Sequence, residues 1–130
     1  MNNRVILVVD DNKVSRMLPA FMLRSFPVKV LECETGEQAF ALLAQHDVSH
    51  VLLDISMPES SGLEVAQTIR DMPEYKHVKL VAYTADARTS QMTMMKSTFF
   101  DDVLIKPIRR LELLSALSLP VPDAGQMALD

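Results

Sequence analysis

Short apolar runs alternate with longer amphipathic stretches along most of the chain. Five runs are rich in Val, Ile and Leu and mostly apolar, as strands buried on both faces are: residues 4–10, 28–32, 50–54, 78–84 and 102–106. Between and after them lie five stretches with apolar residues at helical spacing: 13–26, 36–45, 62–72, 87–98 and 109–117. This strict alternation predicts an α/β fold, a doubly wound parallel sheet of five strands with five helices on its faces.

Two local features qualify this pattern. Pro19 falls inside the first predicted helix, so we expect a kink or the loss of one backbone hydrogen bond there. Residues 119–130 hold two prolines and show no periodic apolar face, which is typical of a flexible tail or the stump of a linker. The length of 130 residues suits one domain, which we place at residues 1–118.

Composition narrows the class of protein. Hydrophobic residues make up 48% of the chain, but the apolar run near its start, Val5 to Val9, is far shorter than the roughly 18 residues of a membrane span. We therefore expect a cytoplasmic protein without membrane contact. A net charge of −4 and scattered basic residues predict no binding of nucleic acid by this chain.

Cysteine and histidine offer little metal chemistry. Cys33 is the only cysteine, so there is no disulfide framework and no thiolate zinc cluster, and we expect a buried structural thiol. His46 and His50 are four residues apart, but the segment between them is predicted to be a helix end running into a strand. We therefore expect two surface histidines rather than a pair of ligands.

Polar residues stand at the carboxyl ends of four predicted strands. Asp10 and Asp11 follow the first, Asp54 ends the third, Thr84 ends the fourth and Lys106 ends the fifth. In a parallel sheet these ends meet at one edge, where open α/β folds place their ligands. Three carboxylates, a hydroxyl and an ammonium brought together there form a site for a divalent cation and a phosphoryl group.

The acids also have simpler interpretations. Asp10 or Asp11 would cap the first helix, but one carboxylate suffices for that, and two acids near Asp54 repel each other unless a cation compensates. Oxygen ligands with room for water suit Mg²⁺. Asp54 would by itself simply begin a turn. Beside a metal and a cation, however, it is a competent nucleophile toward phosphorus.

Thr84 and Lys106 suggest a function only when they are considered together with the three acids. Thr84 alone would be a β-branched strand end, but next to Asp54 its hydroxyl would donate to a phosphoryl oxygen. Lys106 alone would be a solvated lysine before Pro107, which starts a helix. A cis bond at Pro107 would instead direct the ammonium into the crevice.

Four segments, in order, resemble the receiver domain of two-component response regulators: VILVVDDN, LLDISMP followed by a Gly, VAYTA and VLIKP. The resemblance covers residues 4 to about 117. It implies a flavodoxin-like sheet of order 2-1-3-4-5 and a bacterial signalling protein, stand-alone or part of a hybrid sensor histidine kinase. It implies a phosphoacceptor that assists its own phosphorylation and dephosphorylation, not an enzyme.

The resemblance also assigns roles to residues. Asp54 would accept the phosphoryl group from a histidine kinase or phosphotransfer protein, giving an aspartyl phosphate. Asp10, Asp11, Asp54 and the backbone carbonyl of Ser56 would bind Mg²⁺. Thr84 would sense the phosphoryl group, and Lys106 would pair with it.

The chain departs from the family at two places. The family usually has a switch aromatic three residues before the lysine, where this chain has Val103. Phe99 stands where a Gly is common, so we expect a different helix cap or some strain there. Coupling between phosphorylation and output must then rest on loop movement or other residues.

A partner surface is predicted near the fourth helix. Met92, Met94 and Met95 begin a soft apolar face that extends to Leu117 and would bind an unknown output partner or a second copy of the chain. Two alternatives to a phosphorelay switch remain open. One is a phosphorylation-independent module, favoured by Val103 and opposed by the retained acids; the other is a flavin carrier, opposed by acids where a phosphate loop would be.

Overall fold

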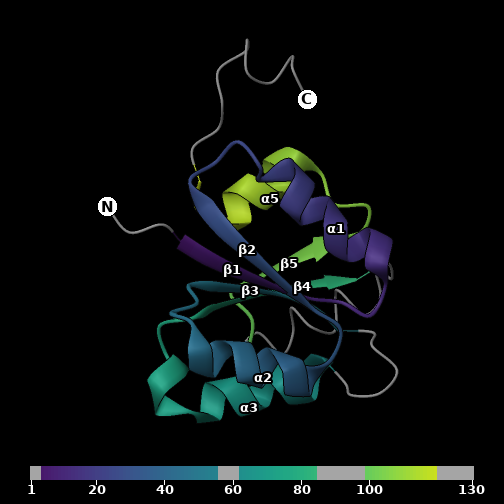
Figure 1. The fold of residues 1–130 in the computed structure, drawn as a ribbon. Coiled ribbons are helices and arrows are strands. Elements are labelled where there is room, and N and C mark those ends of the chain that lie inside the picture. Colours follow the sequence, from purple (N-terminus) through teal and green to yellow (C-terminus); the bar gives the residue numbers. More distant parts are fainter. Residues whose placement is uncertain (1–3, 56–61, 85–98, 120–130) are drawn as a thin grey trace.

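The computed structural model describes residues 4–55, 62–84 and 99–119, which surround one central sheet (Figure 1). Five parallel strands form it in the order β2-β1-β3-β4-β5: β1 (Arg4–Val9), β2 (Val28–Cys33), β3 (His50–Asp54), β4 (Lys79–Thr84) and β5 (Asp102–Ile105). The predicted doubly wound α/β fold is confirmed, and so is the strand order that the resemblance implied.

Helices cover both faces of this sheet, as Figure 1 shows, with α1 and α5 on one side and α2 and α3 on the other. Their bounds are α1 (Lys13–Met22), α2 (Gly36–Gln45), α3 (Gly62–Asp71) and α5 (Arg110–Ala116), with a short 3₁₀ helix η1 (Pro73–Tyr75) after α3. The helix predicted over 87–98 lies outside the described residues, as does the predicted tail apart from Leu119. Within the described part, no helix is long and apolar enough to cross a membrane.

Alternate residues of the central strands feed two separate cores. Leu7, Val9 and Leu53 pack with α2 and α3, whereas Ile6 and Val8 pack with Leu23 and the apolar residues of α5. All five residues of β3 are buried, because strands lie on both sides of it and helices on both faces. This two-sided burial explains why the strands are nearly continuous apolar runs.

The first helix is shorter than predicted. It ends at Met22, not at Phe26, because Leu23 leaves helical geometry at φ −99° and ψ 3°. Tight turn bonds follow, from Arg24 N–H to Phe21 O and from Phe26 N–H to Leu23 O. The helix runs on through the buried Pro19, where the missing N–H removes one backbone hydrogen bond.

One further expectation is corrected, and the conformation of Phe99 is defined. His50 is not a surface histidine: it is 6% exposed, since it begins the central strand, and its Nδ1 lies 2.9 Å from Ser49 Oγ. Phe99 does not adopt a left-handed conformation, because Ser118 is the only non-glycine residue with positive φ in the described ranges. The Phe99 carbonyl instead accepts a hydrogen bond from Arg70 Nε at 3.0 Å. Cys33 is buried, as predicted.

Candidate functional site

The junction between β1 and α1 carries the acid pair but does not use it as a helix cap. Asn12 is the N-cap, and its side chain accepts the Ser15 N–H at 3.0 Å. The Asn12 N–H donates in turn to Asp10 Oδ1 at 2.9 Å. Because Asn12 satisfies the helix start, the capping interpretation of Asp10 and Asp11 is not needed.

Three carboxylates converge at the carboxyl edge of the sheet. Asp10, Asp11 and Asp54 each offer one oxygen within 4.8 Å of the others. Asp10 and Asp54 are buried and Asp11 is exposed. Lys106 Nζ lies 3.3 Å from Asp10 Oδ2 and 3.3 Å from Asp54 Oδ2, so a single ammonium bridges the two buried acids.

The surroundings of Asp10 contain some groups that disfavour the charged form of its carboxyl and others that favour it. Burial raises the pKa of this carboxyl above its usual value, and the Asp54 carboxyl adds to the rise. Hydrogen bonds from Tyr83 and Asn12 and the charge of Lys106 lower the pKa of Asp10 again. The site therefore concentrates negative charge that one lysine does not fully neutralise.

The ends of β4 and β5 hold the remaining predicted residues. Thr84 ends β4, is buried, and accepts the Lys106 N–H at its carbonyl over 2.7 Å. This bond holds the backbone of Lys106 beside β4, and the Lys106–Pro107 peptide bond is cis. Val103, where the family has an aromatic residue, is half-buried on β5 and packs against the core shared with α2 and α3.

Gly62 brings α3 against the end of β3. A Cβ on this residue would lie 2.5 Å from Ile55 Cα and 2.6 Å from the carbonyl oxygen of Asp54, closer than any side chain tolerates. Only glycine permits this approach. The glycine after LLDISMP therefore has a steric role directly behind Asp54, which the sequence pattern alone did not reveal.

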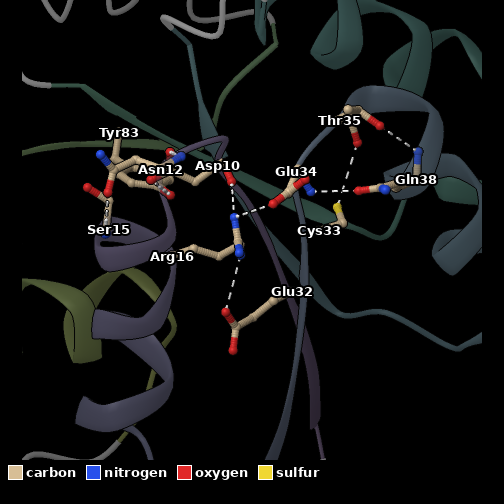
Figure 2. A network of polar contacts seen from close by, with 10 residues as sticks. All are labelled: Asp10, Asn12, Ser15, Arg16, Glu32, Cys33, Glu34, Thr35, Gln38 and Tyr83. Carbon is tan, nitrogen blue, oxygen red and sulfur yellow. Dashed lines mark hydrogen bonds and ion pairs between the residues drawn. The ribbon is translucent and has the colours of Figure 1, made fainter.

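Arg16 fastens the acid-bearing junction to the neighbouring strand, as Figure 2 shows. Its NH1 donates to the Asp10 carbonyl at 2.9 Å, and its guanidinium lies 3.4 Å from Glu32 and 3.5 Å from Glu34. The sequence analysis missed this residue. Its position one helical turn after Asn12 is the signal that would have pointed to the β1–α1 junction.

An apolar rim lies beside the site on α1. Val14, Met17 and Phe21 are 78%, 51% and 58% exposed, at a spacing that places them on one helical face. Val14 also lines a hollow of about 370 Å³, together with Leu18, Lys106 and Ile108. The ammonium of the site thus borders an accessible apolar surface.

The predicted partner and metal sites include four residues beyond the described ranges. Ser56, Met92, Met94 and Met95 lie outside the described residues. Of the face that was predicted to run from the methionines to Leu117, the described part exposes two large apolar side chains, Ile105 and Leu111.

The donor set fits a hard divalent cation. It consists of carboxylate oxygens only, and the exposure of Asp11 leaves room for water on the cation. Mg²⁺ prefers oxygen ligands and retains several waters, whereas zinc sites usually include nitrogen or sulfur ligands. Asp10, Asp11 and Asp54 would hold the ion.

Comparison with known proteins agrees with this geometry. Residues 6–118 match the family model described as the response regulator receiver domain. An uncharacterised 14.6 kDa protein of Leptolyngbya boryana is 33% identical over 124 residues, which are 92% of this chain and 94% of that protein. The CAI-1 autoinducer sensor kinase/phosphatase CqsS of Vibrio cholerae is 30% identical over 118 residues, 90% of this chain.

Solved structures show the same fold. The chemotaxis response regulator CheY4 of Vibrio cholerae has a TM-score of 0.80 at 22% identity, covering 90% of this chain and 98% of that one. The chain belongs to the response regulator receiver family, a domain of two-component phosphorelay signalling. It spans 17% of the length of CqsS and 11% of the virulence sensor protein BvgS of Bordetella pertussis, so it matches one domain of these larger sensor proteins.

Proposed function

We propose that this chain is a phosphoacceptor switch that receives a phosphoryl group on Asp54. The observation that carries the proposal is the position of Asp54, buried at the end of β3 between two further acids and the ammonium of Lys106. Two buried carboxylates beside a third, exposed one and a single lysine do not stabilise a fold, because buried charge that is incompletely paired is destabilising. The arrangement is suitable for binding a cation and a phosphoryl group together.

In the proposed step an Asp54 carboxylate oxygen attacks the phosphorus of the donor. An O–P bond forms on Asp54, the bond between phosphorus and the donor's leaving group breaks, and the leaving group takes the electron pair. Lys106, already 3.3 Å from Asp54 Oδ2, pairs with an oxygen of the transferring group. Thr84, on the strand next to Asp54, donates its hydroxyl to another of those oxygens.

Magnesium completes the charge balance. When bound by Asp10, Asp11, Asp54 and the Ser56 carbonyl, the ion would neutralise charge on the phosphoryl oxygens during transfer. The residues of the chain do the rest: Asn12 and Arg16 hold the β1–α1 junction in place, and Gly62 lets α3 lie close behind Asp54.

A histidine kinase or histidine phosphotransfer protein is the proposed donor. The sensor kinase/phosphatase CqsS and the virulence sensor BvgS contain a matching domain, which supports a donor of this class. Val14 lines the same hollow as Lys106 and shares an exposed apolar helix face with Met17 and Phe21, which supports a protein donor, because a small molecule would not need such a surface. Ile105 and Leu111 belong to the proposed output face, which would bind another protein or a second copy of the chain.

The test is intact mass after incubation with Mg²⁺ and acetyl phosphate. We expect the gain of one phosphoryl group in the native chain, and no gain in Asp54→Asn or in the presence of EDTA. Asp47→Asn is the matched control, since this carboxylate is 97% exposed and lies on the loop before β3, away from the acid cluster. It should be labelled like the native chain.

A different outcome would favour the second candidate. If the native chain gains no phosphoryl group and binds no Mg²⁺ in a titration, the fold serves a phosphorylation-independent interaction. The observation in favour of that candidate is Val103, which leaves β5 without the aromatic residue that couples phosphorylation to output in the family.

A further inference from the structure

Tyr83 is a fully buried residue that points into the acid site. It lies on β4 opposite Asp54 in the strand register, and its ring belongs to the core between the sheet and α1 and α5. Its hydroxyl donates to Asp10 Oδ2 at 2.6 Å, the short distance of a bond to a charged acceptor. Burial and the nearby carboxylates raise the pKa of Tyr83, so the hydroxyl retains its proton.

This bond determines which oxygen of Asp10 is available. Oδ2 accepts from Tyr83 and lies 3.3 Å from Lys106 Nζ, so both of its lone pairs are engaged. Oδ1 accepts one backbone N–H, from Asn12, and keeps its second lone pair. Tyr83 and Asn12 together thus fix the carboxylate plane (Figure 2).

The ring of Tyr83 has a second contact. Lys106 Nζ lies 4.7 Å from the ring centroid, a distance at which an ammonium is attracted to an aromatic face. The same residue therefore touches both members of the Asp10–Lys106 pair, one through its hydroxyl and the other through its ring. Phenylalanine would keep the ring contact and lose only the hydroxyl.

We propose that Tyr83 is a positioning residue for cation binding, holding Asp10 so that Oδ1 is presented to the ion while Oδ2 stays bound to the hydroxyl. This inference rests on the proposed function, since it assumes that Asp10 is a ligand. It adds a residue on β4 to the metal site, one that offers no ligand atom itself. The sequence signal for it is a tyrosine at the next-to-last position of KLVAYT, directly after the aliphatic residues LVA.

The experiment compares Tyr83→Phe with Tyr75→Phe. Tyr75 ends η1, before the start of β4 and so toward the opposite edge of the sheet, and losing its hydroxyl should leave the site unchanged. We expect Tyr83→Phe to weaken Mg²⁺ affinity in calorimetric titration by about tenfold, as when a charged acceptor loses a donor. With acetyl phosphate, the Mg²⁺ concentration for half-maximal labelling should rise by the same factor, with little change in the plateau.

A spectroscopic signal gives an independent readout. The chain has two tyrosines and no tryptophan, so in Tyr75→Phe the near-ultraviolet emission comes from Tyr83 alone. The Tyr83 hydroxyl donates to the Asp10 carboxylate, which is a proposed Mg²⁺ ligand. We therefore expect the emission to change as Mg²⁺ is added, with the same dissociation constant that calorimetry gives. A merely structural tyrosine would give no such titration.

The outcomes separate the two proposals. Absence of Mg²⁺-dependent labelling in the native chain overturns the proposed function and this inference with it. If the native chain is labelled but Tyr83→Phe binds Mg²⁺ equally or more tightly, only the inference fails. It also fails if labelling in the variant is lost at saturating Mg²⁺, or if the Tyr83 emission does not respond while the ion binds. Circular dichroism in EDTA confirms that the variants compared are folded.

Discussion

At the scale of single residues, the informative ones are the polar side chains that the fold buries. Within the described ranges Asp10, Asp54 and Thr84 are buried together at the carboxyl edge of the sheet, and His50 is buried alone at the other end of β3. Burial of the first three fits a binding site. The burial of His50 has no such role, and its cost should be visible in how stability depends on pH.

Burial, together with the charges of Arg4 and Lys79, lowers the pKa of His50 from 6.5 to about 4. The folded chain keeps this imidazole neutral down to about pH 4, whereas the unfolded chain takes up a proton below about 6.5. The free energy of unfolding should therefore fall as pH drops from 6.5 to 4, by up to about 3 kcal/mol from this group. Above pH 6.5 the group should add no pH dependence.

Urea unfolding at several pH values measures this dependence. His50→Leu should flatten the profile between pH 6.5 and 4 relative to the native chain, since leucine has no proton to bind. His77→Gln is the control, because that imidazole is 58% exposed and its loss should leave the profile unchanged. Equal slopes for the native chain and His50→Leu would show that another group carries the acid sensitivity.

At the scale of elements, Arg70 connects α3 to two other parts of the fold. Its Nε donates to Phe99 O at 3.0 Å, NH1 to Val78 O at 2.7 Å, and NH2 to Asp101 Oδ2 at 2.6 Å. Asp101 Oδ2 also accepts the Leu80 N–H at 2.9 Å. One arginine thus donates hydrogen bonds to acceptors in both the segment that leads into β4 and the segment that leads into β5.

Removing this connection should destabilise the chain. Arg70→Met keeps the approximate length of the side chain but removes the donor to two backbone carbonyls and leaves Asp101 with the Leu80 N–H alone, so we expect the free energy of unfolding to fall by about 2–3 kcal/mol. Guanidinium unfolding measures it. Arg24→Met is the matched control, because Arg24 is exposed and stacks only on the exposed Phe21. A loss of similar size in both variants would contradict the role given to Arg70.

Elements were easier to predict than the polar contacts between them. The five apolar runs predicted all five strands to within one residue at either end, because the central strands are buried on both faces and the edge strands β2 and β5 are also mostly apolar. The end of α1 was wrong by four residues, since the tight turn at Leu23 depends on backbone bonds that no apolar period records. The arrangement that satisfies Phe99 was equally hidden, because its donor Arg70 is 29 residues away in sequence.

The candidate site shows the same division. Asp10, Asp11, Asp54 and Lys106 come together as expected, because strand order and strand ends alone place them there. Tyr83, Arg16 and Gly62 were missed. Their contribution depends on which face a side chain takes and on close approach between elements, and neither is readable from spacing.

At the scale of the whole molecule, the proposed cation site should make stability depend on Mg²⁺. Without a metal, Asp11 adds negative charge beside Asp10 and Asp54. The single ammonium of Lys106 already pairs with both of those buried acids. With Mg²⁺ bound as proposed, the same carboxylate would serve as a ligand. A ligand that binds only the folded chain at a hundred times its dissociation constant raises the free energy of unfolding by about 2.7 kcal/mol.

The order of stability between Asp11→Asn and the native chain should therefore reverse when Mg²⁺ is added. In EDTA the variant should be slightly more stable, because a repulsive charge is gone and the side chain is exposed. In Mg²⁺ that nearly saturates the native chain it should be the less stable of the two, because it has lost a ligand. Thermal unfolding in EDTA and in rising Mg²⁺ measures both, with Asp47→Asn expected to follow the native chain throughout. Parallel curves for Asp11→Asn and the native chain would mean that Asp11 does not bind the ion, and the repulsion at this edge of the sheet would then have no compensating partner.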